Sequence, residues 1–145
     1  MRIEIASEAT GELLDAFRRL IPQLTKNSPP LSLDEITALV KSTSSSLLIA
    51  RADDDSIVGV LSLTVYRVPT GIRSIIEDVI VDESVRGQGV GESLMRYALD
   101  LAREADAAHV TLTSNPMRAA ANRLYLRMGF IRRETNAYIY KFKKD

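Results

Sequence analysis

The sequence of 145 residues contains no cysteine and a single histidine, His109. The absence of cysteine excludes disulfide bonds, thiolate metal sites and a cysteine nucleophile. His109 opens a strand-like segment and has no cluster of metal-ligating residues around it in the sequence. We therefore expect a solvated histidine at a strand end, and no metal site.

The chain also lacks an excess of charge of either sign and any long apolar run. Nineteen Lys and Arg residues balance nineteen Asp and Glu residues, so no electrostatic footprint for nucleic acid or a membrane surface is present. No segment is long enough to span a bilayer, and the N-terminus lacks the apolar core of a signal peptide. The length suits one domain with a real core. We expect a single soluble domain over residues 1–145, located in the cytoplasm.

The most informative segment is the glycine-rich turn at residues 86–91, which reads Arg-Gly-Gln-Gly-Val-Gly. The β-branched residues of 75–81 predict a strand before it, and an apolar stripe at helical spacing predicts a helix over 90–105. A further strand at 109–113 would then lie parallel to the first. A glycine turn that opens a helix presents backbone N–H groups without covering side chains, so this turn predicts an anion-binding site.

Two familiar nucleotide motifs do not fit the turn. A dinucleotide fingerprint needs a third glycine where Glu92 stands, and a phosphate loop needs Gly-Lys-Ser/Thr where this chain has Gly91-Glu92-Ser93. The pattern present, Arg-x-x-Gly-x-Gly, resembles the acetyl-CoA signature of the GNAT N-acetyltransferase superfamily. The structural alternative is a plain tight turn into a helix.

Residues 117–130 carry a second resemblance to the same superfamily. Arg118, Asn122 and Tyr125 share one face of a predicted helix, and Gly129 suits the left-handed position that ends it. The segment is similar to the family's Ala-x-x-x-Tyr helix that closes in Gly-Phe. In that family the tyrosine lies beside the thioester sulfur and protonates the departing CoA thiolate, a role that falls on Tyr125. The alternative for Tyr125 is a core aromatic with its hydroxyl at the edge.

The resemblance extends over about residues 46–143, with one departure, because Arg118 stands where the family often has asparagine. It implies that the pantetheine arm of acetyl-CoA pairs with the backbone of residues 79–81 and that the pyrophosphate lies on the glycine turn. The residues expected to contact acetyl-CoA are Val79, Ile80, Val81, Arg86, Gly87, Gln88, Gly89, Val90, Gly91, Glu92, Asn115, Asn122 and Tyr125.

The fold that the resemblance implies is the α/β (α+β) GNAT fold. It has a mixed, mostly antiparallel sheet of about seven strands and about four flanking helices, with acetyl-CoA in the notch between parallel strands 74–82 and 109–114. Sequence patterns predict helix N-caps at Thr10 and Ser32, the latter in a capping box with Glu35. Further strands are predicted at 2–6, 47–52 and 57–68, and a closing hairpin at 130–133 and 137–142.

Glu77 is the candidate general base. An amine with a lysine-like pKa near ~10.4 must lose a proton before it attacks a thioester, and a carboxylate in reach of it can accept that proton. The strand periodicity places Glu77 on the same face as Ile75 and Val79. A water relayed to Glu77, or no protein base at all, are the alternatives, and Asp78 is either part of the acceptor site or a solvated charge.

These observations together predict an acetyl-CoA-dependent N-acetyltransferase that moves the acetyl group directly to a primary amine of a small molecule, without a metal. The balanced charge disfavours a charged macromolecular acceptor. Two alternatives are transfer to a protein N-terminus or lysine, and a non-catalytic acyl-CoA-binding module. The presence of both Tyr125 and Glu77 favours the enzyme. A homodimer is left open.

Overall fold

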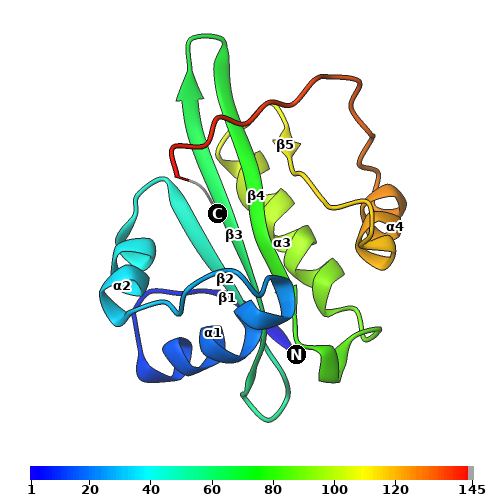
Figure 1. The fold of residues 1–145 in the computed structure, drawn as a ribbon. Helices are drawn as coiled ribbons and strands as arrows, with labels where there is room; N and C mark the ends of the chain where they lie inside the picture. Colours follow the sequence, from blue (N-terminus) through cyan, green and yellow to red (C-terminus); the bar gives the residue numbers. More distant parts are fainter. Residues whose placement is uncertain (144–145) are drawn as a thin grey trace. The chain divides into compact units, whose positions relative to one another are not determined.

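The computed structural model describes residues 1–143 and separates into two compact units, Met1–Thr113 and Ser114–Asp145 (Figure 1). The first unit carries a sheet with three α-helices, and the second carries one helix and an irregular segment. The expectation of a single domain over the whole chain stays a prediction.

The first unit is built on a five-stranded sheet in the order β1-β2-β3-β4-β5. The strands are β1 (Arg2–Ile5), β2 (Ser45–Arg51), β3 (Ile57–Val68), β4 (Gly71–Val81) and β5 (Val110–Thr111). The first four pair antiparallel and β5 pairs parallel to β4. A mixed, mostly antiparallel sheet with one parallel pair is thereby confirmed, and Figure 1 shows β3 and β4 as its long central hairpin.

Two of the helices begin at the caps that the sequence predicts. The first helix, α1 (Gly11–Leu24), is capped by Thr10, whose hydroxyl accepts from the N–H of Leu13 at 3.1 Å. The second, α2 (Leu33–Lys41), has the full capping box: the N–H of Glu35 donates to Ser32 Oγ at 3.1 Å, and the N–H of Ser32 donates to Glu35 Oε1 at 3.0 Å. These caps satisfy first-turn N–H groups that lack partners within the helix.

The sheet is covered on both faces. The apolar sides of α1 and α2 form one buried cluster with alternate residues of the strands; it comprises Leu13, Ala16, Phe17, Leu20, Ile36, Leu47, Ile49, Ile57, Val60 and Ile80. The third helix, α3 (Val90–Glu104), packs on the opposite face at Gly59. A Cβ at Gly59 would lie 3.1 Å from the side chains of Val90 and Leu94, so any larger residue there would press against this helix.

The second unit holds the fourth helix, α4 (Ala119–Arg127). It ends in a Schellman motif: the N–H of Phe130 donates to the carbonyl of Tyr125 at 3.0 Å, and that of Gly129 to Leu126 at 3.1 Å. Gly129 has φ +101°, which is the left-handed conformation that this motif requires. The predicted role of Gly129 is confirmed, and the total of four α-helices in the described residues agrees with the expected number.

Two expectations for the sheet are wrong. The closing hairpin of 130–133 with 137–142 is absent, so residues 1–143 contain five strands and not about seven. Tyr138 and Phe142 are 90% and 93% exposed. Alternating apolar residues make a strand only where a neighbouring strand pairs with them, and this segment has none in the described chain. β5 also covers only two residues of the predicted 109–113, because its pairing with β4 stops there.

Two further findings concern the described residues alone. None of their helices is both long and apolar enough to cross a bilayer. They contain no group of three or more Asp, Glu or His side chains placed to hold a metal ion.

Candidate functional site

Strand β4 carries a β-bulge beside the candidate base. Glu77 pairs with Ser62 and Ile80 pairs with Val60, so three steps along β4 match two steps along β3. The extra residue of such a bulge interrupts the ladder and re-aims its neighbours. Asp78 lies within the bulge at φ +52°, a left-handed conformation that aspartate tolerates better than most residues.

The bulge changes the predicted surroundings of Glu77. Glu77 shares a face with Ile75, as expected, but beyond the bulge Ile80 and not Val79 continues that face. The reason is that one extra residue reverses the alternation of side chains. Ile80 belongs to the core that α1 and α2 cover, whereas Glu77 is exposed. Glu77 therefore lies on the α1–α2 face of the sheet with its side chain exposed.

The pairing between the parallel strands β4 and β5 is short. β5 pairs with β4 only at Ser74 and Ile75. Ser74 is fully buried, and its hydroxyl donates to the carbonyl of His109 at 2.8 Å, which anchors the start of β5. On the β5 side of β4, no strand of the described residues pairs with the stretch from Ile76 to Val81, whereas β3 continues along the other side. On this side, residues 79–81 have no strand partner among the described residues, which is the condition that pairing with an extended ligand requires.

The glycine turn follows directly. A 3-10 turn, η1 (Glu83–Val85), leads into it, and α3 begins at Val90 with Gly89 as its N-cap. Gly87 and Gly89 have φ +81° and +82°, a region that favours glycine strongly. A Cβ built at either would meet nothing within 4 Å. The missing side chains therefore leave open space over the backbone at this turn.

The first turn of α3 has the uncapped form that the predicted anion site requires, and anion binding there stays a prediction. No side chain caps it, in contrast with α1 and α2. The first-turn N–H groups of a helix lack partners within it, and the positive end of the helix dipole lies there too. A pyrophosphate fits this donor set, because several N–H groups can bind its oxygens without a side chain in between.

The other residues predicted for the turn have distinct positions. Arg86 and Gln88 are exposed, and Arg86 Nε donates to the carbonyl of Val81 at 3.3 Å. Val90 is buried, whereas Glu92 pairs with Arg96 of the next helical turn at 3.1 Å. Arg86 thus joins the end of β4 to the start of the turn.

In the second unit, Asn115 and Asn122 hold the start of α4. Asn115 Oδ1 accepts from the N–H of Met117 at 2.9 Å. The Asn122 amide donates to the carbonyls of Asn115 and Arg118 at 3.0 and 2.9 Å. These contacts give both side chains a structural function, and their contact with a cofactor stays a prediction.

Tyr125 is held on two sides within the same unit. It is 7% exposed, and its ring lies 6.0 Å from that of Phe130 at an interplanar angle of 60°. This is the contact between the third-last helical position and the residue after the glycine that accompanies a Schellman motif. The Gly-Phe ending of the motif therefore fixes the tyrosine ring.

Burial raises the pKa of the Tyr125 phenol above its ordinary value, and the charge and hydrogen bond of Arg118 partly offset this effect. Because the net direction is upward, the phenol keeps its proton across the neutral range. A donor that bonds to the phenol oxygen also stabilises the phenolate that remains after proton transfer. Tyr125 thus has the protonation state that a general acid needs.

The sequence also matches a known protein family. The model of the "Acetyltransferase (GNAT) family" matches residues 12–130. The chain belongs to the GNAT family of acetyltransferases.

Individual relatives of this GNAT protein support the same fold. Over 58 residues it is 47% identical to streptothricin acetyltransferase of Streptomyces lavendulae, a match that covers 40% of this chain and 31% of that protein. An acetyltransferase of Trypanosoma brucei superimposes with a TM-score of 0.76 at 25% identity, covering 97% of this chain and 99% of that one. An aminoglycoside acetyltransferase from an uncultured soil metagenomic sample, in complex with sisomicin, gives 0.80 at 20% identity, covering 99% and 96%. The last likeness concerns the fold alone.

Sequence reasoning missed two features of the GNAT site. The bulge at Asp78 is a property of pairing between two strands, and its only local signal is an aspartate in a strand otherwise rich in β-branched residues. The effect of Arg118 on the pKa of the Tyr125 phenol also went unpredicted. Its signal was present, because the two residues lie seven apart on one helical face.

Proposed function

We propose that this protein is an acetyl-CoA-dependent N-acetyltransferase that transfers an acetyl group directly to a primary amine of a small molecule. The observation that carries the proposal is the turn from Arg86 to Gly91. Both left-handed glycines and the uncapped first turn of α3 lie in the Arg-x-x-Gly-x-Gly segment, whose sequence resembles the family's acetyl-CoA signature. The acetyl thioester supplies an activated acyl group, and the protein supplies binding, orientation and proton transfer.

The cofactor contacts follow the shape of the first unit. Residues 86–92 bind the pyrophosphate through backbone N–H groups, with the positive charge of Arg86 beside them. The backbone of residues 79–81 pairs with the amides of the pantetheine arm. Support for this second contact comes from β5, whose pairing with β4 stops at Ile75 and leaves the edge open.

Two side chains move protons in the proposed reaction. Glu77 takes a proton from the acceptor ammonium, directly or through water, so that the amine nitrogen can form its bond to the acetyl carbon. The carbon–sulfur bond breaks, and Tyr125 donates its proton to the thiolate. The second proton that the nitrogen loses as the amide forms passes to solvent, from which the Tyr125 phenolate takes a proton back. The exposure of Glu77 and the raised pKa of Tyr125 suit a base that meets solvent and an acid that stays protonated.

The acceptor class is a small-molecule amine, in the manner of streptothricin. The 47% identity to streptothricin acetyltransferase over 58 residues supports this class. The equal numbers of acidic and basic residues agree with it, because they provide no field for a highly charged macromolecule.

The test is release of free CoA, followed by thiol detection, with saturating acetyl-CoA and a panel of amines. The panel contains streptothricin, aminoglycosides, aminosugar phosphates, amino acids, polyamines and short peptides. We expect release that depends on a small-molecule amine and a product heavier by one acetyl group in mass spectrometry. Release with peptides alone would assign the protein acceptor instead. Binding of acetyl-CoA with no release for any amine would leave an acyl-CoA-binding module.

A further inference from the structure

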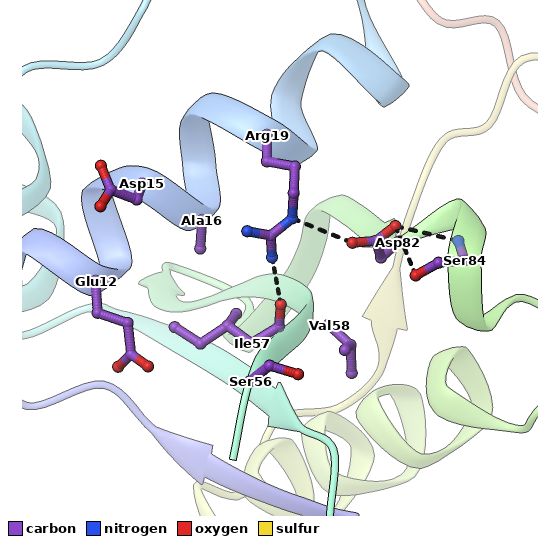
Figure 2. A pocket seen from close by; sticks show the side chains of 9 residues that line it. All are labelled: Glu12, Asp15, Ala16, Arg19, Ser56, Ile57, Val58, Asp82 and Ser84. Carbon is purple, nitrogen blue, oxygen red and sulfur yellow. Dashed lines mark hydrogen bonds and ion pairs between the residues drawn. The ribbon is translucent and has the colours of Figure 1, made fainter. Parts of the chain in front are cut away.

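Helix α1 is linked by two side chains to the segment that joins β4 to the glycine turn. Arg19 Nε donates to Asp82 Oδ2 at 3.2 Å, and Arg19 Nη2 donates to the carbonyl of Ile57 at 2.5 Å. One helical turn later, Gln23 Oε1 accepts from the N–H of Glu83 at 2.9 Å. Figure 2 shows the Arg19 guanidinium extended between Asp82 on one side and Ile57 on the other.

Asp82 also bonds to the segment that leads into the glycine turn. Its Oδ1 accepts from the N–H and the hydroxyl of Ser84, both at 3.1 Å, and its own N–H donates to the carbonyl of Val58 at 2.8 Å. One carboxylate oxygen thus bonds to α1 while the other caps η1, which leads into the turn (Figure 2). The Asp82 side chain is 13% exposed, so the carboxylate end of the bridge is largely shielded from solvent.

Arg19 forms its ion pair with Asp82 and not with the other acidic side chains near it. Glu12 and Asp15 line the same cleft, but Glu12 bonds to Arg51 through both of its oxygens, at 2.9 and 3.0 Å. Asp82 is therefore the carboxylate that Arg19 engages. Its pKa is held below the ordinary value, first by the N–H of Ser84 and also by Arg19.

We infer that Arg19 is a positioning residue for acetyl-CoA binding: it fixes Asp82, and through it the approach to the glycine turn, without contacting the cofactor. This inference rests on the proposed function. Arginine suits the role because its planar fork can bond to a carboxylate and a carbonyl at once, which a lysine ammonium does with less geometric control. The Arg19 side chain is 48% exposed. We therefore expect its removal to change the free energy of unfolding little.

The experiment compares Arg19→Met with Arg18→Met. Methionine keeps an unbranched apolar stem and removes the charge and the donors. Arg18 lies beside Arg19 in α1 and is exposed, so its substitution makes the same charge change away from the bridge. Acetyl-CoA affinity is measured by calorimetry, and hydrogen exchange of residues 83–93 is measured in the free protein.

We expect Arg19→Met to bind acetyl-CoA roughly threefold to tenfold more weakly, with the same proportional rise in KM and a nearly unchanged kcat. Its amides at 83–93 exchange faster, while Arg18→Met matches the parent in both measurements and Arg19→Lys recovers part of the affinity. Equal affinity in Arg19→Met and the parent, or unchanged exchange at 83–93, would overturn the inference. A parent protein that fails to bind acetyl-CoA would instead contradict the proposed function, and the exchange data would still show whether Arg19 holds the turn.

Discussion

The glycine turn and helix α4 contribute to the candidate site in different ways. The turn acts through backbone: Gly87 and Gly89 are left-handed, no side chain caps α3, and the space above is open. In α4 the proposed functional group is a single hydroxyl on Tyr125, whose ring is buried and contacts Phe130.

Because of this difference, substitutions in the two regions should affect different quantities, namely acetyl-CoA binding and the chemical step. A backbone site loses function when atoms are added, because an extra side chain fills the space that the ligand needs. A side-chain site loses function when an atom is removed, because the proton donor disappears. Substitutions in the turn are therefore expected to change acetyl-CoA affinity, and substitutions around Tyr125 to change turnover.

The largest expected effect comes from Tyr125→Phe. The variant removes the hydroxyl and keeps the ring contact with Phe130, so kcat is expected to fall by about 10²–10⁴-fold with acetyl-CoA affinity nearly unchanged. Steady-state kinetics and calorimetry measure the two quantities. Tyr140→Phe is the matched control, because Tyr140 is 82% exposed. Parental turnover in Tyr125→Phe would mean that water or the amine itself protonates the thiolate.

Glu77→Gln is expected to lower kcat/KM for the amine by about a hundredfold. The loss is greatest at low pH, where little free amine is present and removal of a proton limits the rate. The pH profile of kcat/KM measures this, with Glu104→Gln as a control at an exposed position in α3. If Glu77→Gln has the same profile as the parent, no base is required at this position.

Arg118→Met has a smaller expected effect, which concerns pH dependence. Arg118 lowers the pKa of Tyr125 against the larger effect of burial, so its removal raises that pKa further. The general acid is lost as pH rises through the pKa of the phenol, and the alkaline limb of kcat therefore moves to higher pH in the variant. Ultraviolet difference titration against Tyr125→Phe measures the phenol directly. An alkaline limb of kcat at the same pH in Arg118→Met and the parent would show that Arg118 does not act on Tyr125.

The smallest functional effect is expected at a capped helix. Thr10→Ala removes the hydroxyl that accepts from the N–H of Leu13, which costs about 1 kcal/mol of stability. Chemical denaturation measures this loss, and Thr10→Ser should recover most of it. Acetyl-CoA affinity is expected to stay at the parental value, since this cap lies on α1. A large loss of affinity would show that stability and cofactor binding are not separable in this fold.

The sequence predicts well those features that depend on neighbours along the chain. Thr10, the Ser32–Glu35 box and Gly129 all act within a few residues, and each is found in the predicted role. Both ends of β3 lie where the sequence predicts them, because turn residues flank the strand on each side. Local chemistry decides each of these features.

Features that depend on residues far apart in the sequence could not be predicted from local patterns. The bulge at Asp78 exists because β3 and β4 differ by one residue in their pairing, and β5 is short because its pairing with β4 stops at Ile75. Residues 137–142 have an apolar, strand-like composition but no strand beside them among the described residues. The contact between Arg118 and Tyr125 depends on side-chain conformation, which helical spacing permits but does not dictate.

The central claim is that the glycine turn binds acetyl-CoA, and calorimetric titration of Gly89→Asp and Gly71→Asp tests it most directly. Both glycines have positive φ, and a Cβ at either meets nothing within 4 Å, but Gly71 lies at the β3–β4 hairpin. With both variants confirmed as folded by thermal melting, we expect Gly71→Asp to bind acetyl-CoA like the parent. Gly89→Asp should bind roughly a hundredfold more weakly, about 2.8 kcal/mol, because a carboxylate then occupies the position of the pyrophosphate. Equal affinity in Gly89→Asp and the parent would contradict the account.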